Sequence, residues 1–191
     1  MKTVTRPRAA VGALGFLAAT TLALTGCAPS GSSGGDPDAP KSLVVGVTAD
    51  VDTLLPWTST QFQASNVLQN LYGTLTELDD DLTVVPGLAE SWDTSEDGLT
   101  VTFHLREGVT FADGSAFDAQ DVVASYEAIK DEGTAAVSAT NLASVDTVEA
   151  VDDATVQLTL SAPDAALFSK LAVITTAILP SDADLASLAT Y

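Results

Sequence analysis

The 191-residue sequence is poor in the side chains that most enzymes and metal sites use. It contains one cysteine, Cys27, and one histidine, His104, so no disulfide can form within the chain. A zinc site draws on His and Cys ligands, of which the sequence has one each, with the Cys assigned to lipid, and a serine hydrolase needs a base near a G-x-S-x-G nucleophile, which the sequence lacks. We expect His104 to be a half-exposed strand residue, and the chain to be no enzyme and to use no cofactor.

Two further kinds of ligand site lack their sequence patterns. The glycines between Gly31 and Gly35 follow no predicted strand and open no predicted helix, so they do not form a phosphate-binding loop. The acidic clusters lack the spacing of a calcium loop. We expect them to be solvated turns at Asp79-Asp80-Asp81, Asp93/Glu96/Asp97 and Asp152-Asp153.

Basic residues are scarce as well. Seven Lys and Arg stand against 26 Asp and Glu, which gives a net charge of −19. A surface of this sign repels nucleic acid and anionic lipid headgroups, so we expect neither as a partner.

The first 41 residues have the layout of an exported lipoprotein. Residues 1–26 combine a basic start, a short apolar run and small residues, which is typical of a secretory signal. Leu24-Thr25-Gly26-Cys27 resembles the lipobox of bacterial lipoproteins, in which the cysteine after the cut carries the lipid. Residues 27–41 then form a lipidated cysteine and a flexible Gly, Ser and Pro tether. Without the signal, four basic residues remain against 26 acidic ones, a net charge of −22, so the predicted membrane anchor is the lipid.

The pattern after residue 42 predicts a mixed α/β domain with short, antiparallel strands and no internal repeat. Alternation of apolar and polar side chains over Leu99–Arg106 is the clearest strand signal. One helix is predicted at about 61–72, ended by Gly73, and another after Asp118, an N-cap with Asp121 in the capping-box position. Further strands are predicted at 43–47, 75–78, 82–85 and 88–92, with a hairpin of 145–151 and 154–160 and a short helix at 165–171.

The two tryptophans have different surroundings. Trp92 falls in a strand-like run and is expected in the core. Trp57 lies in a loop that continues through Thr60, Gln61, Phe62 and Gln63, and aromatic and amide side chains in a loop are typical of ligand contacts. Ordinary packing of Trp57 is an equal alternative.

Residues 43–180 resemble the solute-binding proteins of peptide and nickel ABC importers, the oligopeptide- and dipeptide-binding family. The matching pieces stand in family order: Leu43-Val44-Val45-Gly46, Asp52-Thr53-Leu54-x-Pro56, Asn70-Leu71-Tyr72-x-x-Leu75, residues 85–92 (VPGLAESW), residues 98–109 (GLTVTFHLREGV), Phe111-x-Asp113-Gly114, Asp121-Val122-Val123-x-Ser125-Tyr126 and Val156-x-Leu158-x-Leu160-x-x-Pro163.

The resemblance implies a fold. The chain would be the N-terminal part of a two-lobed clamp of the type II periplasmic-binding-protein kind, with the second lobe missing. Residues 42–72 would begin the first lobe, 73–161 would form an inserted mixed α/β subdomain, and 162–191 would return to the first lobe, truncated.

The resemblance also implies a function. The protein would be a monomeric receptor on the outer face of the cytoplasmic membrane that captures a di- or oligopeptide and delivers it to the permease and ATPase subunits of an importer. A nickel complex, haem, glutathione or an oligosaccharide are alternative solutes, and a sensing or enzymatic lipoprotein is an alternative role. The ligand contacts implied in this stretch, by position in the loop, are Thr60 to Gln63.

Overall fold

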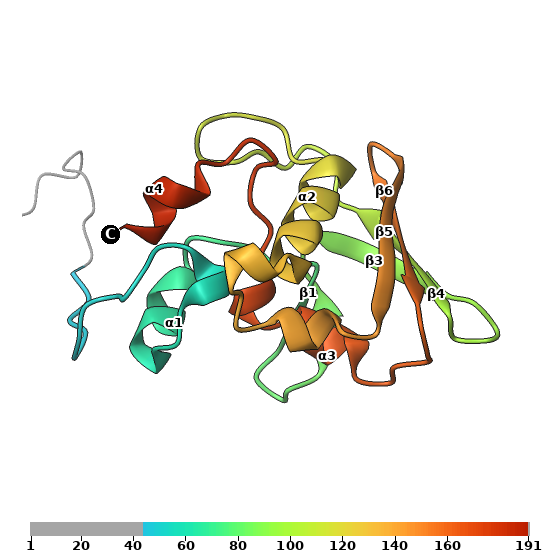
Figure 1. Cartoon of the computed structure of the whole chain (residues 1–191), viewed down its shortest axis with the longest axis horizontal. Coiled ribbons are helices and arrows are strands. Elements are labelled where there is room, and N and C mark those ends of the chain that lie inside the picture. The colour runs from blue at the N-terminus through green and yellow to red at the C-terminus, as the bar shows by residue number, and fades with distance from the viewer. Residues whose placement is uncertain (1–43, 191) are drawn as a thin grey trace, which may run out of the picture. The chain divides into compact units, whose positions relative to one another are not determined.

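The computed structural model describes residues 44–190. The predicted signal sequence, the predicted lipidation site at Cys27 and the predicted tether lie outside these residues. The described elements are, in chain order, η1 (Pro56–Thr58), α1 (Phe62–Leu68), β1 (Thr76–Leu78), β2 (Val84–Pro86), β3 (Ala89–Thr94), β4 (Thr100–Leu105), α2 (Ala119–Lys130), η2 (Glu132–Thr134), η3 (Ala139–Leu142), β5 (Val145–Asp152), β6 (Thr155–Leu160), α3 (Leu167–Leu171), η4 (Ile174–Thr176) and α4 (Leu185–Ala189) (Figure 1). Within them, no helix is long and apolar enough to cross a membrane.

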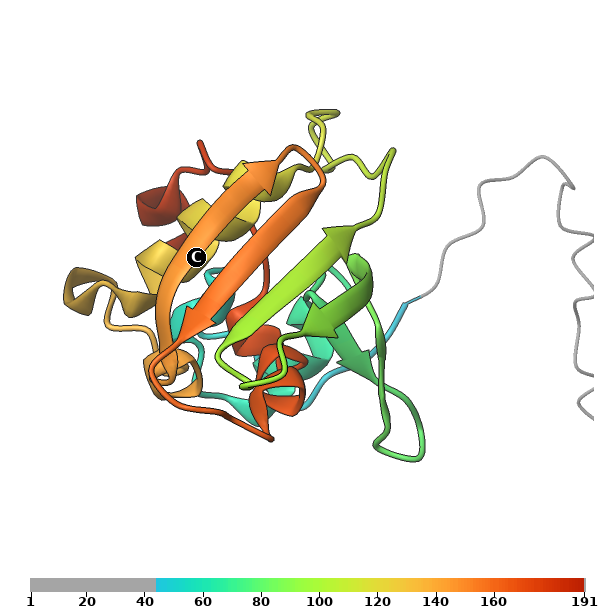
Figure 2. The ribbon, with the colours of Figure 1, turned by 90° about the vertical axis from the view of Figure 1, so that its right-hand side faces the viewer.

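A four-stranded antiparallel sheet dominates this part of the chain. Its strand order is β3-β4-β6-β5, and β1 and β2 pair separately as a two-stranded ribbon. Figure 2 shows the four strands from the face that no described helix covers, with α2 behind them. Helix α2 packs against β5 and β6 on the covered face.

The predicted alternation along β4 is confirmed. Val101, Phe103 and Leu105 are at most 3% exposed, whereas the residues between them are half-buried on the opposite face. Phe103 lies opposite Trp92 of β3 and Val156 of β6, which places its ring in the centre of the sheet. Trp92 is half-buried and stacks on Phe168 at a centroid distance of 5.1 Å, so it packs against the core as predicted.

Helix α2 begins as the sequence predicts. The Asp118 carboxylate accepts hydrogen bonds from Gln120 N–H, at 2.8 Å, and from Asp121 N–H, and Asp121 Oδ2 accepts one from Asp118 N–H at 3.0 Å, which completes a capping box. Its inner face buries Val122, Tyr126 and Ile129 completely. The hydroxyl of Tyr126 is buried and has no hydrogen-bond partner among residues 44–190.

The same helix holds the segment that precedes α4. Asp121 Oδ1 accepts a hydrogen bond from Ser181 N–H at 2.8 Å. One turn further, the buried Ser125 hydroxyl accepts from Leu179 N–H at 3.0 Å and donates to Leu179 O at 3.3 Å. Two residues of the predicted helix therefore fix the course of residues 179–181.

Two predicted elements differ from the structure. The predicted strand at 43–47 is not formed over its described part, residues 44–47, where Val44 is 91% exposed and no described strand pairs with it. Helix α1 ends at Leu68 instead of Tyr72, because the next turn tightens with Leu71 N–H bonded to Leu68 O. Phe62 and Leu71, which the helical spacing places in a common stripe, are exposed.

The second half of the chain follows the prediction closely. Strands β5 and β6 form the predicted hairpin, in which Val148 lies opposite Leu158 and the chain reverses at Asp152-Asp153. The predicted helix at 165–171 is present as the shorter α3, whose buried Leu167 and Leu171 join the core.

Candidate functional site

The loop that carries the predicted ligand contacts is closed by a carboxylate. Asp52 Oδ1 accepts a hydrogen bond from the Ser59 hydroxyl at 2.8 Å, and Asp52 Oδ2 accepts one from Thr60 N–H at 3.0 Å. Desolvation acts to raise the pKa of Asp52, but the hydrogen bonds from Thr60 and Ser59 outweigh it, so this pKa lies below its ordinary value. The Asp52 carboxylate therefore joins the two ends of the segment 52–60.

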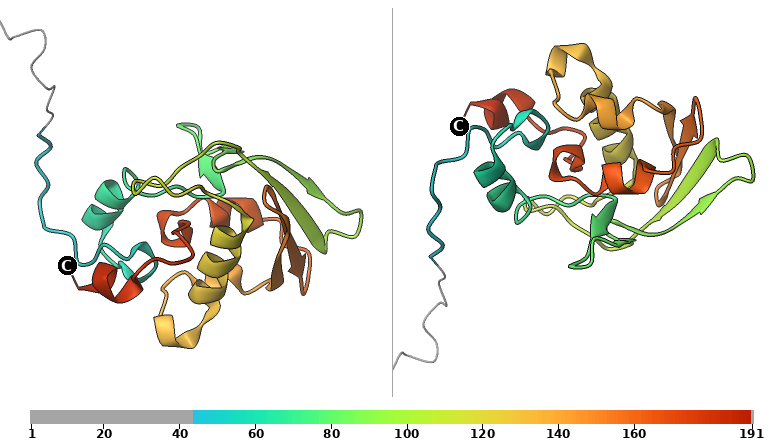
Figure 3. Two further views of the ribbon diagram at one scale, coloured as in Figure 1. Left: turned by 90° about the horizontal axis from the view of Figure 1, so that it is seen from above. Right: turned by 90° about the horizontal axis from the view of Figure 1, so that it is seen from below.

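The residues after Asp52 attach the same loop to its neighbours. Leu54 N–H and the Thr53 hydroxyl both donate to Leu188 O of α4, at 3.1 and 3.2 Å. The Tyr72 hydroxyl donates to Leu54 O at 2.8 Å. Both views of Figure 3 show α4 beside the segment that leads into η1. The Asp-Thr-Leu-x-Pro motif thus acts as the anchor of this loop.

Trp57 lies inside the molecule. Its side chain is 2% exposed, and its indole N–H donates to Ala177 O at 2.8 Å. Its own carbonyl oxygen accepts from Val137 N–H at 2.8 Å. The indole N–H is therefore already bonded within the described fold, which favours the packing alternative for this residue.

The other predicted contacts lie at the surface. Thr60, Gln61 and Phe62 are exposed and Gln63 is half-buried at the start of α1. The backbone is extended at Ser59 and Gln61, with φ/ψ of −66°/132° and −94°/130°. Phe62 is 78% exposed and lines a groove of about 640 Å³ together with Asn70, Glu77 and Val173. The loop thus exposes Thr60, the extended backbone of Gln61 and the aromatic ring of Phe62.

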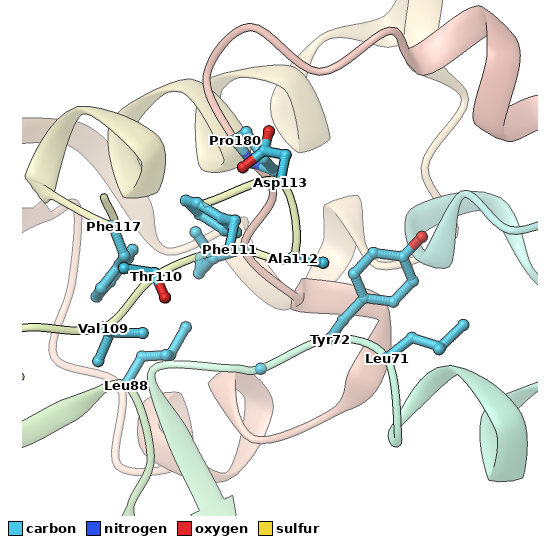
Figure 4. Close-up of a pocket in the computed structure, with 12 residues that line it drawn as sticks. Leu71, Tyr72, Leu88, Val109, Thr110, Phe111, Ala112, Asp113, Phe117 and Pro180 are labelled. Carbon is cyan, nitrogen blue, oxygen red and sulfur yellow. The ribbon is translucent and has the colours of Figure 1, made fainter. Parts of the chain in front are cut away.

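A second concavity of about 380 Å³ lies between the end of the α1 turn and the loop before α2 (Figure 4). Apolar side chains dominate its lining, among them Leu88, Phe111 and Phe117, and Tyr72 and Asp113 lie at its edges. The Asp113 carboxylate is occupied by the hydroxyl and N–H of Ser115, which lower its pKa. The lining is a concave apolar surface that has few polar groups to orient a solute.

The remaining candidate side chains have local roles. His104 Nε2 lies 3.1 Å from Asp93 Oδ2 at the surface of the sheet, which is the half-exposed strand position predicted for it. Asp79, Asp97 and Asp152 accept hydrogen bonds from N–H groups of their own turns, as solvated turn residues do, whereas Asp93, predicted in a turn, lies in β3 opposite Thr102 because the strand continues to Thr94. Within residues 44–190 there is no group of three or more His, Cys, Asp or Glu residues arranged to hold a metal ion.

Comparison with protein families identifies the family of this chain. Residues 83–190 match the model described as bacterial extracellular solute-binding proteins, family 5 Middle. The chain belongs to this family. The family is one of solute-binding proteins and not of enzymes, and the match covers β2 to α4, including the sheet, α2 and the segment that α2 holds.

Individual relatives of this chain are binding proteins as well. A glutathione-binding protein, GsiB of Pectobacterium atrosepticum, is 34% identical over 134 residues, which are 70% of this chain and 26% of the relative. The Agrobacterium binding protein AgaA in complex with agropinic acid superposes with a TM-score of 0.66 and 33% identity, over 69% of this chain and 27% of its own. Haemophilus influenzae OppA in complex with the peptide RPPGFSPFR gives a TM-score of 0.65 and 28% identity, over 69% and 29%.

The covered shares show how much of a family member's length this chain represents. The chain spans about a quarter of the length of the curated relatives it matches. The mixed α/β fold described above therefore corresponds to one part of the known solute-binding structures.

Sequence reasoning named the loop but missed the groups that hold it. In the sequence, Asp52, Thr53 and Tyr72 could be identified only as members of the family motifs. Their hydrogen-bond partners lie between seven and 135 residues away, so the motifs did not predict these bonds. One local signal was available: an Asp seven residues before Ser59-Thr60 is close enough to close a short loop by accepting from both residues.

Proposed function

We propose that this protein is the extracytoplasmic receptor of an ABC importer, which captures a small solute and delivers it to a membrane permease. The observation that carries the proposal is the family match over residues 83–190. ATP hydrolysis would take place on other subunits of the importer. The predicted signal and lipobox support the export of the chain to the side of the membrane where such a receptor works.

The solute that we propose is a di- or oligopeptide. GsiB is a glutathione-binding protein and OppA binds a nonapeptide, and both ligands carry peptide bonds. Extended backbone at the exposed Gln61 supports this choice, because an extended segment can pair with a peptide through main-chain hydrogen bonds, whatever the peptide sequence. AgaA binds agropinic acid, so solutes of other classes stay alternatives.

The mode of capture that we propose is closure of a two-lobed clamp. Residues 42–72 and 162–191 would belong to the first lobe, and 73–161 would be the inserted subdomain. The hydrogen bonds from residues 53–54 to Leu188, and from Trp57 to Ala177, support the grouping of the two outer segments, since they join them directly. A second lobe would complete the pocket opposite Thr60–Gln63 and close by a hinge.

The test is a calorimetric titration of the complete gene product with glutathione and with RPPGFSPFR. We expect one of them to bind with a dissociation constant of about 10 μM or lower, and the 191-residue chain to bind at least about tenfold more weakly, because most of a clamp's contacts require both lobes. Binding of glutathione but not of RPPGFSPFR would favour the glutathione alternative, and failure of both to bind the complete product would refute both assignments. Equal affinity in the 191-residue chain would argue against capture between two lobes.

A separate prediction concerns the membrane. We expect Cys27→Ala to move most of the protein from the membrane fraction to the soluble fraction, because two acyl chains anchor a protein stably and a surface of net charge −22 provides no second attachment to anionic lipid. The measurement is fractionation of cells that express the wild type or the variant. Ser30→Ala in the predicted tether is the control and should stay on the membrane. A Cys27→Ala protein that remains bound would show that another anchor exists.

A further inference from the structure

The loop between η1 and α1 is held at its middle by a single side chain. Ser59 after η1 and Gln61 before α1 have extended backbone, and Thr60 between them is exposed. The Asp52 carboxylate takes the Ser59 hydroxyl at 2.8 Å with one oxygen and Thr60 N–H at 3.0 Å with the other. The Thr60 hydroxyl lies at 3.5 Å from the second oxygen, the limit of a hydrogen bond.

The ends of the loop are fixed independently of this carboxylate. Before it, Thr53 and Leu54 are bonded to Leu188 of α4. Within it, Trp57 is buried and bonded to Ala177 and Val137. After it, Ala64 and Leu68 of α1 are completely buried. Loss of the Asp52 carboxylate would therefore release residues 59–61 without removing the contacts that hold η1 and α1 in place.

We propose that Asp52 is the positioning residue of the solute site, and that it fixes the backbone beside the exposed residues Thr60 and Gln61, to which the solute pairs. The inference rests on the proposed function and names a residue that regulates the shape of that same site. Asp52 would act through the loop, because each of its oxygens accepts a hydrogen bond from Ser59 or Thr60. Its effect is to spare the solute the entropic cost of ordering the loop during binding.

The first readout is spectroscopic and requires no solute. An N–H that donates to a carboxylate resonates downfield of one that donates to water, so the amide proton of Thr60 should move upfield in Asp52→Ala. Asp52→Asn retains one acceptor oxygen for Thr60 N–H, and the Ser59 hydroxyl can accept from its amide group, so the shift should be largely rescued. Asp50→Ala, which removes an exposed carboxylate two residues earlier, is the matched control and should leave the Thr60 resonance in place.

The second readout is affinity. For the complete gene product, titrated with glutathione and with RPPGFSPFR, Asp52→Ala should weaken the binding of the accepted peptide by about tenfold, the size expected for loss of hydrogen bonds to a charged group. Asp52→Asn should bind within about threefold of the wild type, and Asp50→Ala should be indistinguishable from it. The midpoint of urea unfolding is measured for each variant, so that loss of fold is separated from loss of loop order.

The outcomes are distinct. A wild type that binds a peptide and an Asp52→Ala variant that is folded and binds it equally well would overturn the role of Asp52 while leaving the proposed function standing. An unchanged Thr60 resonance in Asp52→Ala would show that Asp52 does not hold the loop, and would overturn the proposal. A wild type that binds neither peptide would overturn the peptide function and, with it, a role for Asp52 in peptide capture. The expected pattern, in which resonance and affinity change together and Asn restores both, would support the proposal.

Discussion

Asp121→Ala is expected to lower the free energy of unfolding of the 191-residue chain by about 2–4 kcal/mol. The carboxylate is 4% exposed and accepts two main-chain hydrogen bonds, one from Asp118 N–H inside its own capping box and one from Ser181 N–H, 60 residues away. Alanine would leave both donors without this partner and would remove a negative charge from the first turn of α2, where the helix dipole favours it. Urea denaturation followed by circular dichroism measures the change.

Two variants of the same helix test the reason for this effect. Asp118→Ala removes the side-chain acceptor of the first turn, which takes hydrogen bonds from Gln120 N–H and Asp121 N–H, and should cost about 1 kcal/mol. Tyr126→Phe removes a buried hydroxyl that has no partner among the described residues, so it should leave stability within about 1 kcal/mol of the wild type or raise it. Equal losses for Asp118→Ala and Asp121→Ala would mean that the bond to Ser181 adds nothing.

These two aspartates also show what the sequence could and could not predict. The capping box depends on spacing alone, because both partners lie within one helical turn, and it was predicted correctly. The bond from Asp121 to Ser181 depends on how a segment 60 residues later crosses the helix. No local pattern contains that information, so the sequence predicted only one of the two hydrogen bonds of Asp121.

The strands divide in the same way. Alternation along β4 predicted which side chains are buried, since one face of the sheet is covered by α2 and the period of a strand is two. The run Leu43–Val47 has equally strong β propensity, yet residues 44–47 form no strand, because a strand needs a neighbour to supply its hydrogen bonds. The β propensity is a property of the segment alone, whereas strand formation also requires a partner strand.

The candidate site was predicted by position and not by contact. Thr60 to Gln63 are at or near the surface, as a binding loop requires, but their shape depends on Asp52 and Thr53, which appeared in the sequence only as part of a motif. Trp57, in contrast, was assigned to the loop with two alternatives open. Its burial of 98% and its bond to Ala177 favour packing over ligand contact.

We expect Trp57→Ala to destabilise the 191-residue chain by about 3–5 kcal/mol, the usual cost of deleting a buried tryptophan. The substitution removes a ring that is 2% exposed and leaves the buried carbonyl of Ala177 without its indole partner. Trp57→Phe retains most of the apolar volume and loses the N–H, so it should cost about 1–3 kcal/mol, dominated by the unpaired carbonyl. Urea denaturation again gives the values, with Trp92 as the remaining fluorescent reporter of the fold.

Phe62→Ala provides the contrast within the same loop. Its ring is 78% exposed, so its removal should change stability by no more than about 0.5 kcal/mol. If Phe62 belongs to the solute site, Phe62→Ala should weaken peptide binding by the complete gene product while its stability stays constant, and Trp57→Phe should do the reverse. A Trp57→Phe variant with unchanged stability and weakened binding would return Trp57 to the ligand contacts. That result would require the loop to open and expose a side chain that the described fold encloses.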